Sequence, residues 1–358
     1  MKFNTKCVHG SGRPDSTGAI SPAIYMSSTF SHPKLGDTTG YQYSRESNPT
    51  RDRLEQLIAG LEDGKDALAF SSGMAAVDAV FHLFSPGDHI ILGDDLYGGS
   101  IRMFTNIYEQ NGIEFTYVGT SDLEAVKAAF KPNTKALFGE TISNPSLEVL
   151  DIEKFARIAH SHGVPLIVDN TFPTPINCRP FEWGADIVVH STTKYMDGHA
   201  TSVGGCIVDS GNFDWDAHAE KFPGLCTPDE SYHGLTYTKA FGKGAYITKA
   251  TAQLMRDLGS IQSPQNSFLL NLGLETLHLR MPQHCRNAQK VAEYLSKNEK
   301  VAWVNYCGLP DNKYYSLAQK YMPNGSCGVI SFGLKGGRDV SIKFMDSLEF
   351  IAIVTHVA

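Results

Sequence analysis

Short apolar runs alternate with amphipathic stretches through the first two thirds of the chain. The runs are rich in β-branched residues and are bounded by glycine and polar residues, which is typical of buried strands. The pattern predicts strands at 67–70, 89–92, 114–119, 135–140, 165–170 and 186–191. Because helical periodicity separates these strands, we expect an α/β fold with a mostly parallel sheet and helices on both faces.

Local signals mark some of the helix ends. Ser121 and Glu124 form a capping-box pattern at the start of one amphipathic stretch. Asp151 is the expected N-cap of the next helix, and Gly163 follows that helix. These signals place a helix directly after two of the predicted strands.

The two ends of the chain differ from this alternating middle. Residues 1–50 lack periodicity and are rich in Gly, Pro, Ser and Thr, so they are expected to form an extended arm. Residues 51–276 would form the α/β domain. From about 277 the pattern changes to a strong helix at 284–298 and shorter strand-like runs, which predicts a smaller α+β domain over 277–358.

Composition and charge narrow the class of protein. The chain has 358 residues, of which 42% are hydrophobic and 19% charged, and this suits about two globular domains. The net charge is −7 and no long basic run is present, so we expect no nucleic-acid or anionic-membrane partner. No apolar run is long enough for a bilayer-spanning helix or a signal peptide.

The seven cysteines are scattered and form no C-x-x-C pair. A disulfide framework or a zinc site is therefore not expected, and a reducing cytoplasm fits the cysteine usage.

A lysine in the stretch "HSTTKYMDGH" (190–199) is the first candidate for chemistry. Lys194 follows the last predicted strand and three small hydroxyl residues. In open parallel sheets, ligands bind at the carboxyl ends of the strands. The simpler alternative is a solvated surface lysine, and this stretch alone does not exclude it.

Two other loops follow predicted strands and carry polar groups. In "SSGMAA", Ser72, Gly73 and Met74 lead into a helix, whose first N–H groups can bind an anion. Asp169 ends an apolar strand, so its carboxylate needs a charged or hydrogen-bonding partner. An ordinary N-cap and a turn aspartate are the alternatives at these two places.

Together the three loops suit one ligand. A helix N-terminus with the hydroxyls of Ser191 and Thr193 would hold a phosphate, Asp169 would face a ring nitrogen, and Lys194 would meet a carbonyl. This set of groups indicates pyridoxal phosphate. The sequence contains no P-loop, G-x-G-x-x-G, H-E-x-x-H or G-x-S-x-G motif that would favour another chemistry.

From about residue 3 to its end, the sequence resembles the Cys/Met-metabolism family of pyridoxal-phosphate enzymes. The resemblance is carried in order by "YQYSRESNPT", "FSSGMAA", "DLYGGS", "ETISNPSLEVLDI", "IVDNTFPTP", "HSTTKYMDGHATSVGG" and "GLETLHLRMPQHC". It implies the aspartate-aminotransferase-like fold (fold type I), with a smaller C-terminal α+β domain.

The resemblance also implies roles for individual residues. Lys194 corresponds to the Schiff-base lysine, Asp169 to the partner of the ring nitrogen, Tyr97 to the stacking ring, and Asn144 to a neighbour of the phenolic oxygen. The residues implied to bind the phosphate are Ser72, Gly73, Met74, Ser191 and Thr193.

Tyr43 and Arg45 resemble the residues that reach the phosphate of a neighbouring subunit. The active site would then need at least a dimer, and the resemblance implies a tetramer.

Finer motifs are similar to the O-acetylhomoserine sulfhydrylases of the family. These are "CRPFEWGADIVVHSTTKY" and "FPGLCTPDESYHGLTY". Thr201 and Ser202 stand where many lyases have Asp-Val or Asp-Ile, and Gly99 stands where methionine γ-lyases typically have cysteine.

The implied reaction converts O-acetyl-L-homoserine and sulfide, or a thiol, to L-homocysteine and acetate. Lys194 would move protons between the α and β carbons, and Tyr97 is a second candidate acid or base. A methionine or cystathionine γ-lyase, a cystathionine γ-synthase and a non-catalytic pyridoxal-phosphate-binding protein stay open as alternatives.

The last residues, "FIAIVTHVA", are expected to form an apolar strand that is cut short. The family continues beyond this point with an arginine that binds the substrate carboxylate, so a longer C-terminus is expected. His356 falls near the position of a serine that touches the same carboxylate in many relatives.

Overall fold

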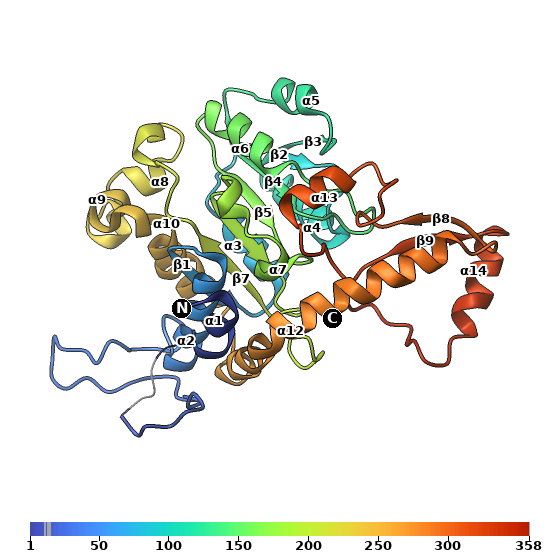
Figure 1. Cartoon of the computed structure of the whole chain (residues 1–358). Coiled ribbons are helices and arrows are strands. Elements are labelled where there is room, and N and C mark those ends of the chain that lie inside the picture. The colour runs from blue at the N-terminus through green and yellow to red at the C-terminus, as the bar shows by residue number, and fades with distance from the viewer. Residues whose placement is uncertain (11, 13–15, 358) are drawn as a thin grey trace.

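A seven-stranded sheet forms the centre of the computed structural model, which describes residues 1–10, 12 and 16–357 (Figure 1). The strand order is β1-β7-β6-β5-β4-β2-β3. The strands are β1 (Asp66–Phe70), β2 (His89–Gly93), β3 (Glu114–Val118), β4 (Thr134–Glu140), β5 (Leu166–Asp169), β6 (Ile187–His190) and β7 (Gly205–Asp209). All six predicted strands are confirmed.

The sheet is mostly parallel, as predicted. Strands β3, β2, β4, β5 and β6 run parallel to one another, whereas β7 is antiparallel to both β6 and β1. The sequence analysis missed β7, because its short apolar run follows a glycine-rich loop without a helix before it. The carboxyl ends of β4, β5 and β6 therefore meet at one edge, where the parallel-sheet argument places a ligand.

Helices cover both faces of the sheet. Alternate residues of β2 show this, because Ile90 packs into one hydrophobic cluster with Phe81, while Ile91 packs into another with Phe155. The principal covering helices are α2 (Pro49–Glu62), α3 (Gly73–Phe81), α6 (Ile152–Ser161) and α12 (Pro264–Ser296).

The remaining helical segments are short. They are α1 (Phe3–His9), α4 (Gly98–Met103), α5 (Leu123–Ala128), α7 (Thr174–Asn177), α8 (Pro223–Cys226), α9 (Tyr237–Phe241), α10 (Ala245–Lys249), α11 (Arg256–Leu258), α13 (Tyr315–Tyr321), α14 (Gly337–Asp346), the π-helical segments Phe104–Tyr108 and Ala250–Met255, and the 3-10 turns Pro180–Trp183, Asp216–His218, Glu230–Tyr232 and Gly242–Gly244. Among the described residues, no helix is both long and apolar enough to cross a bilayer.

The prediction of the helix start is confirmed for α6 and wrong by one residue for α5. Asp151 is the N-cap residue of α6, and Gly163 follows that helix with φ of +65°. The capping box at Ser121 is wrong, because Asp122 caps α5 and accepts a hydrogen bond from the Ala125 N–H at 2.9 Å. A carboxylate at that position also interacts favourably with the positive helix end.

The long helix α12 connects the sheet region to the C-terminal elements. It begins at Pro264, where Ser263 accepts a hydrogen bond from the Asn266 N–H at 3.1 Å, so the expected domain boundary at 276/277 falls inside it. Beyond it, β8 (Val301–Asn305) and β9 (Ser331–Leu334) form an antiparallel pair, accompanied by α13 and α14 (Figure 1).

The expected strand in the tail is wrong. Residues 350–357 form no strand, and Phe350, Ile351 and Ile353 are exposed. No described strand lies beside this segment to satisfy its backbone hydrogen-bonding groups, which a strand requires. Instead, the tail returns from α14 towards the large sheet, and Val357 packs against the hydrophobic clusters there (Figure 1).

The N-terminal arm contains one unexpected element. Helix α1 packs against α2 and α12 and buries Cys7. Residues 19–42 form no helix, and Ile20, Met26 and Leu35 are largely exposed. The loops in this part project away from the body of the molecule (Figure 1).

Candidate active site

A cavity of about 440 Å³ opens at the carboxyl ends of β4, β5 and β6. All the site residues expected from the sequence line it, except Tyr43 and Arg45. Those that do are Ser72, Gly73, Met74, Tyr97, Asn144, Asp169, Ser191, Thr193, Lys194 and His356. Its volume is in the range of small-molecule sites.

One end of the cavity is suited to an anion. Ser72 caps α3 by accepting a hydrogen bond from the Ala75 N–H at 3.0 Å, which leaves the earlier N–H groups of Gly73 and Met74 at the helix end without an intrahelical partner. A Cβ at Gly73 would lie 2.7 Å from the Cβ of Ser191, so only glycine allows this close approach. The Thr193 hydroxyl donates to the Gly204 carbonyl at 3.1 Å and accepts from the Gly204 N–H at 3.0 Å.

Asp169 lies at the end of β5, deep in the protein but in contact with the cavity. Its Oδ1 accepts hydrogen bonds from the Thr171 N–H at 2.9 Å and the Thr171 hydroxyl at 2.5 Å. Burial raises the pKa of Asp169, while these two bonds and the nearby His190 oppose the rise. Asp169 therefore does stabilise the turn after β5, which was the alternative explanation for this aspartate. No described group donates a hydrogen bond to its Oδ2, so this oxygen stays available to a ligand.

Glu140 ends the neighbouring strand β4 and also lines the cavity. It pairs in register with Asp169, and its Oε1 accepts a hydrogen bond from the Tyr97 N–H at 2.6 Å. Burial and the charges of Asp169 and Asp95 raise the pKa of Glu140 well above its usual value.

Lys194 and His356 approach the cavity with unpaired nitrogen atoms. Within the described part of the chain, the Lys194 amine makes no hydrogen bond or ion pair, and burial lowers its pKa. The buried Nε2 of His356 likewise has no described partner. Burial and the charge of Lys194 lower the pKa of His356.

A buried hydrogen-bond network lies behind the site. His190 Nε2 is 2.6 Å from Glu62 Oε1, and Asn170 Nδ2 donates to the same oxygen at 3.0 Å. This network joins the end of α2 to the two residues that flank the cavity strands, and so fixes the backbone next to Asp169 and Ser191.

Sequence reasoning missed Glu140 and Thr171. The signal for Glu140 was available, since it ends a predicted strand in the same way as Asp169. The only sequence signal for Thr171 was its position two residues after Asp169.

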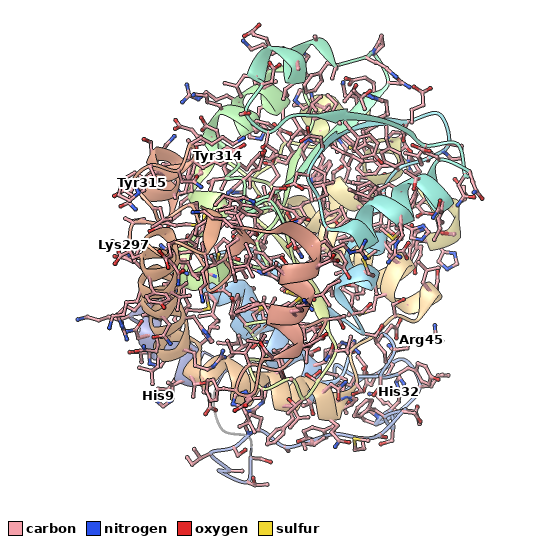
Figure 2. All side chains as sticks on the ribbon, turned by 90° about the vertical axis from the view of Figure 1, so that its right-hand side faces the viewer. His9, His32, Arg45, Lys297, Tyr314 and Tyr315 are labelled. Atoms are coloured by element: carbon pink, nitrogen blue, oxygen red, sulfur yellow. The ribbon has the colours of Figure 1, made fainter. Side chains whose placement is uncertain are left out.

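Tyr43 and Arg45 do not line the cavity of this chain. Arg45 donates to the carbonyl of Arg256, and its guanidinium carbon lies 5.1 Å from the centre of the Tyr43 ring. Figure 2 shows Arg45 at the periphery of the molecule.

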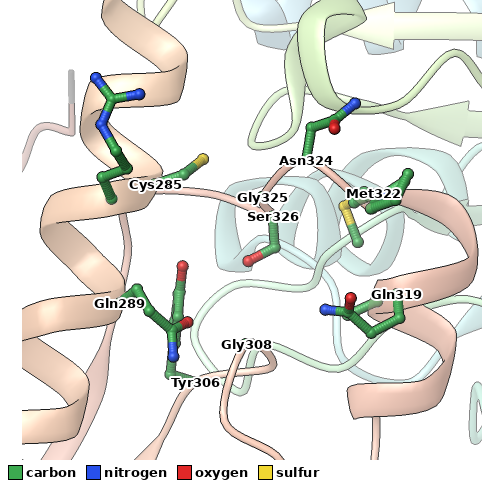
Figure 3. Close-up of a pocket in the computed structure, with 12 residues that line it drawn as sticks. Cys285, Gln289, Tyr306, Gly308, Gln319, Met322, Asn324, Gly325 and Ser326 are labelled. Atoms are coloured by element: carbon green, nitrogen blue, oxygen red, sulfur yellow. The ribbon is translucent and has the colours of Figure 1, made fainter.

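A second cavity of about 250 Å³ lies between α12 and α13 (Figure 3). Ser326 points into it, and Cys285, Gln289 and Tyr306 are part of its wall. None of its lining residues is acidic or a histidine, and burial raises the pKa of the Cys285 thiol, so it lacks a base and a reactive thiolate. No cluster suited to a metal ion occurs among the described residues.

Comparison with known proteins shows the family to which the chain belongs. The model of the Cys/Met metabolism PLP-dependent enzymes matches residues 4–357. The chain belongs to this family, and its cofactor is pyridoxal phosphate (PLP).

Two relatives within this family are similar to the chain over most of its length. A homocysteine/cysteine synthase of Kluyveromyces lactis is 47% identical over 301 residues, which cover 84% of this chain and 68% of the relative. An O-acetyl-L-homoserine sulfhydrylase of Leptospira meyeri is 40% identical, with all of this chain and 85% of the relative covered.

A solved structure confirms the predicted fold class. An O-acetylhomoserine (thiol)-lyase of Campylobacter jejuni, which carries a pyridoxyl-lysine phosphate, matches with a TM-score of 0.96 at 34% identity. The match covers 99% of this chain and 90% of that one.

The residues of the cavity fit PLP. A helix end that tolerates no side chain at Gly73 suits the phosphate, and an unpaired amine on Lys194 suits the aldehyde. The free Oδ2 of Asp169 suits a protonated ring nitrogen, whose positive charge would favour the ionised carboxylate.

Proposed function

We propose that this protein is an O-acetyl-L-homoserine sulfhydrylase, which forms L-homocysteine from O-acetyl-L-homoserine and sulfide or a thiol. The observation that carries the proposal is the single cavity that gathers Lys194, Asp169 and Tyr97 beside an anion-binding helix end. The sulfhydrylase and synthase names of the relatives support the choice of reaction.

In this proposal the chain's own groups hold and orient the cofactor. The amides of Gly73 and Met74 and the hydroxyls of Ser191 and Thr193 bind the phosphate. The ring of Tyr97 stacks on the cofactor, and Asn144 lies near its phenolic oxygen.

When bound, PLP supplies an electron sink for negative charge that develops on the substrate carbons. Asp169, oriented by its two hydrogen bonds from Thr171, holds the proton on the ring nitrogen. The amine of Lys194, whose pKa is lowered by burial, takes the proton from the α carbon and moves protons between the α and β carbons. Tyr97 is a second proton donor or acceptor beside it.

The overall exchange balances at the γ carbon. The bond from this carbon to the acetate oxygen breaks, and acetate leaves with the electron pair. Hydrosulfide then forms the new carbon–sulfur bond. We assign the unpaired Nε2 of His356 to the substrate side of the cavity, where it would bind the α-carboxylate.

We further propose that the protein acts in the cytoplasm as a homo-oligomer, with sites shared within a dimer and two dimers in a tetramer. All seven cysteines are free thiols, which supports a reducing compartment. The exposed apolar residues of the arm support a contact with a second copy.

The test is product analysis on the PLP-loaded protein. With O-acetyl-L-homoserine and sulfide we expect equal amounts of homocysteine and acetate, and with methionine or cystathionine alone little 2-oxo acid or ammonia. The reverse result would assign a lyase, and bound PLP with neither product would assign a non-catalytic binding protein.

Lys194→Ala provides the control for the site itself. Borohydride should fix the pyridoxyl group to Lys194 in the wild-type protein, and mass spectrometry of its peptides would show this. Lys194→Ala should lose both the labelled peptide and turnover, whereas Lys239→Ala, at an exposed lysine, should keep both. Turnover that survives in Lys194→Ala would refute the assignment.

A further inference from the structure

Glu140 occupies a position in the cavity that the proposed function leaves unused. Its side chain is 7% exposed, and its Oε1 accepts the Tyr97 N–H at 2.6 Å. Gly99 lies two residues after Tyr97, and a Cβ added there would lie 2.4 Å from the Tyr97 ring. The ring therefore rests against the backbone at Gly99, and the anchored backbone of Tyr97 decides where the ring lies.

Glu140 also faces a second carboxylate. It pairs in register with Asp169 on the adjacent parallel strand, and such strands lie roughly 5 Å apart. The other ionisable groups that face it are Asp95 and Tyr97, from the segment before α4, with Lys194 across the cavity. Two ionised carboxylates on paired residues in a buried site repel each other, while burial and the charge of Asp169 raise the pKa of Glu140, so one of them keeps a proton.

The hydrogen bonds decide which carboxylate carries the charge. Asp169 receives two hydrogen bonds from Thr171 and would face the positive ring nitrogen of the cofactor. Among the described residues, Glu140 receives only backbone N–H groups, those of Tyr97 and Asn144, and it would face no positive group of the cofactor. A protonated carboxyl group can still accept such bonds through its carbonyl oxygen.

We propose that Glu140 is a positioning residue whose protonated carboxyl group anchors Tyr97 over the cavity and leaves the negative charge of the pair on Asp169. The inference rests on the proposed function only in taking this cavity as the cofactor site. It assigns no contact between Glu140 and the reacting atoms, since Glu140 acts through Tyr97 and Asp169.

The first test uses cofactor-free protein and measures thermal unfolding against pH for the wild type and Glu140→Gln. At pH values above its ordinary pKa, a buried acid of this kind is still protonated in the folded state but has lost its proton in the unfolded state. Stability of the wild type then falls as pH rises from about 4.5 towards neutral. Glu140→Gln removes this loss, so its advantage in melting temperature should grow with pH.

Glu148→Gln is the matched control, because Glu148 is a nearby carboxylate outside the cavity. Burial is outweighed there by hydrogen bonds from Tyr314, Thr120 and Lys313, so the pKa of Glu148 is lowered. This variant should be less stable than the wild type at neutral pH, and the deficit should vanish as pH falls. A pH-independent difference between Glu140→Gln and the wild type would overturn the proton assignment.

The second test measures the dissociation constant and absorption spectrum of bound PLP. Glu140→Gln keeps an oxygen acceptor for the Tyr97 N–H, so both should stay close to wild type. Glu140→Leu leaves that N–H unpaired, and we expect the dissociation constant to rise on the order of tenfold. Equal weakening in both variants, or none in Glu140→Leu, would overturn the positioning role.

These measurements use no substrate. A failed sulfhydrylase assay would therefore leave them interpretable, and a failed Glu140 test would leave the proposed reaction in place.

Discussion

At the residue scale, Thr171 connects the two halves of the site through one hydroxyl group. This hydroxyl donates to Asp169 Oδ1 at 2.5 Å and accepts from the Ser191 N–H at 2.8 Å. Asp169 is placed to face the ring nitrogen and Ser191 the phosphate, so a single side chain fixes the spacing of two cofactor contacts.

We expect Thr171→Val to weaken PLP binding by about 5- to 150-fold, which corresponds to roughly 1–3 kcal/mol. The reason is that the hydroxyl's hydrogen bond to Asp169 and its hydrogen bond from the Ser191 N–H are both lost. The Thr171 N–H bond to Asp169 survives, so the fold should be retained. Thr171→Ser keeps the hydroxyl and should stay near wild type. Titration of cofactor-free protein with PLP measures both, and wild-type affinity in Thr171→Val would show that the hydroxyl has no positioning role.

The sequence located the cavity residues that lie in distinctive motifs and missed those that matter only through a contact, while the roles of all of them stay predictions. Lys194 and Asp169 follow strands inside distinctive motifs, and the structure brings both to one cavity. Glu140 matters through its register with Asp169, and Thr171 through a bond between two loops. Neither relation is visible in a linear pattern. The role of Arg45 stays a prediction, because it concerns a second subunit.

At the element scale, strands that alternate with helices along the chain were predictable. Segments whose secondary structure depends on whether another strand lies beside them were not. Strand β7 gains its place by inserting between β1 and β6, and the tail at 350–357 has no such neighbour despite its apolar residues. The start of α12 at Pro264 was missed because the periodicity before residue 277 is weak, whereas the cap at Ser263 is a local signal that could have been used.

The first residue of the interior strand β2 is a histidine that should make the fold sensitive to acid. His89 of β2 is fully buried, and its two ring nitrogens lie 2.8 Å from the hydroxyls of Thr134 and Thr116 on the flanking strands. Burial and the charge of Lys131 lower the pKa of His89 to about 4. The ring is therefore neutral in the folded protein at pH values where the unfolded chain is already protonated.

We expect this histidine to contribute stability that is complete above pH about 6.5 and is lost as pH falls towards about 4. The unfolded state binds the extra proton in that window, so stability rises with pH there. Urea unfolding at a series of pH values should show a shallower acid slope for His89→Gln than for the wild type. His9→Gln, at an exposed histidine, should leave the slope unchanged. Parallel slopes for His89→Gln and wild type would contradict the expectation.

At the scale of the whole molecule, the arm carries apolar side chains that are exposed in the described part of the chain. Ile20 is 89% exposed and Leu35 fully exposed, and Arg45 lies on the same arm away from the cavity of its own chain. This arrangement suits an arm that packs on a second copy and brings Tyr43 and Arg45 to that copy's phosphate.

Subunit mixing tests the sharing directly. Arg45→Ala alone should retain PLP poorly, because a charge-assisted bond to phosphate is lost, and Lys194→Ala alone should turn over no substrate. When the two variants are co-expressed, each mixed dimer has one site with Lys194 from one chain and Arg45 from the other. In a two-fold dimer with random pairing, about a quarter of all sites should then be intact. Turnover and borohydride-fixed PLP should rise together to that level. If the mixture gives only the sum of the separate variants, Arg45 acts within its own chain.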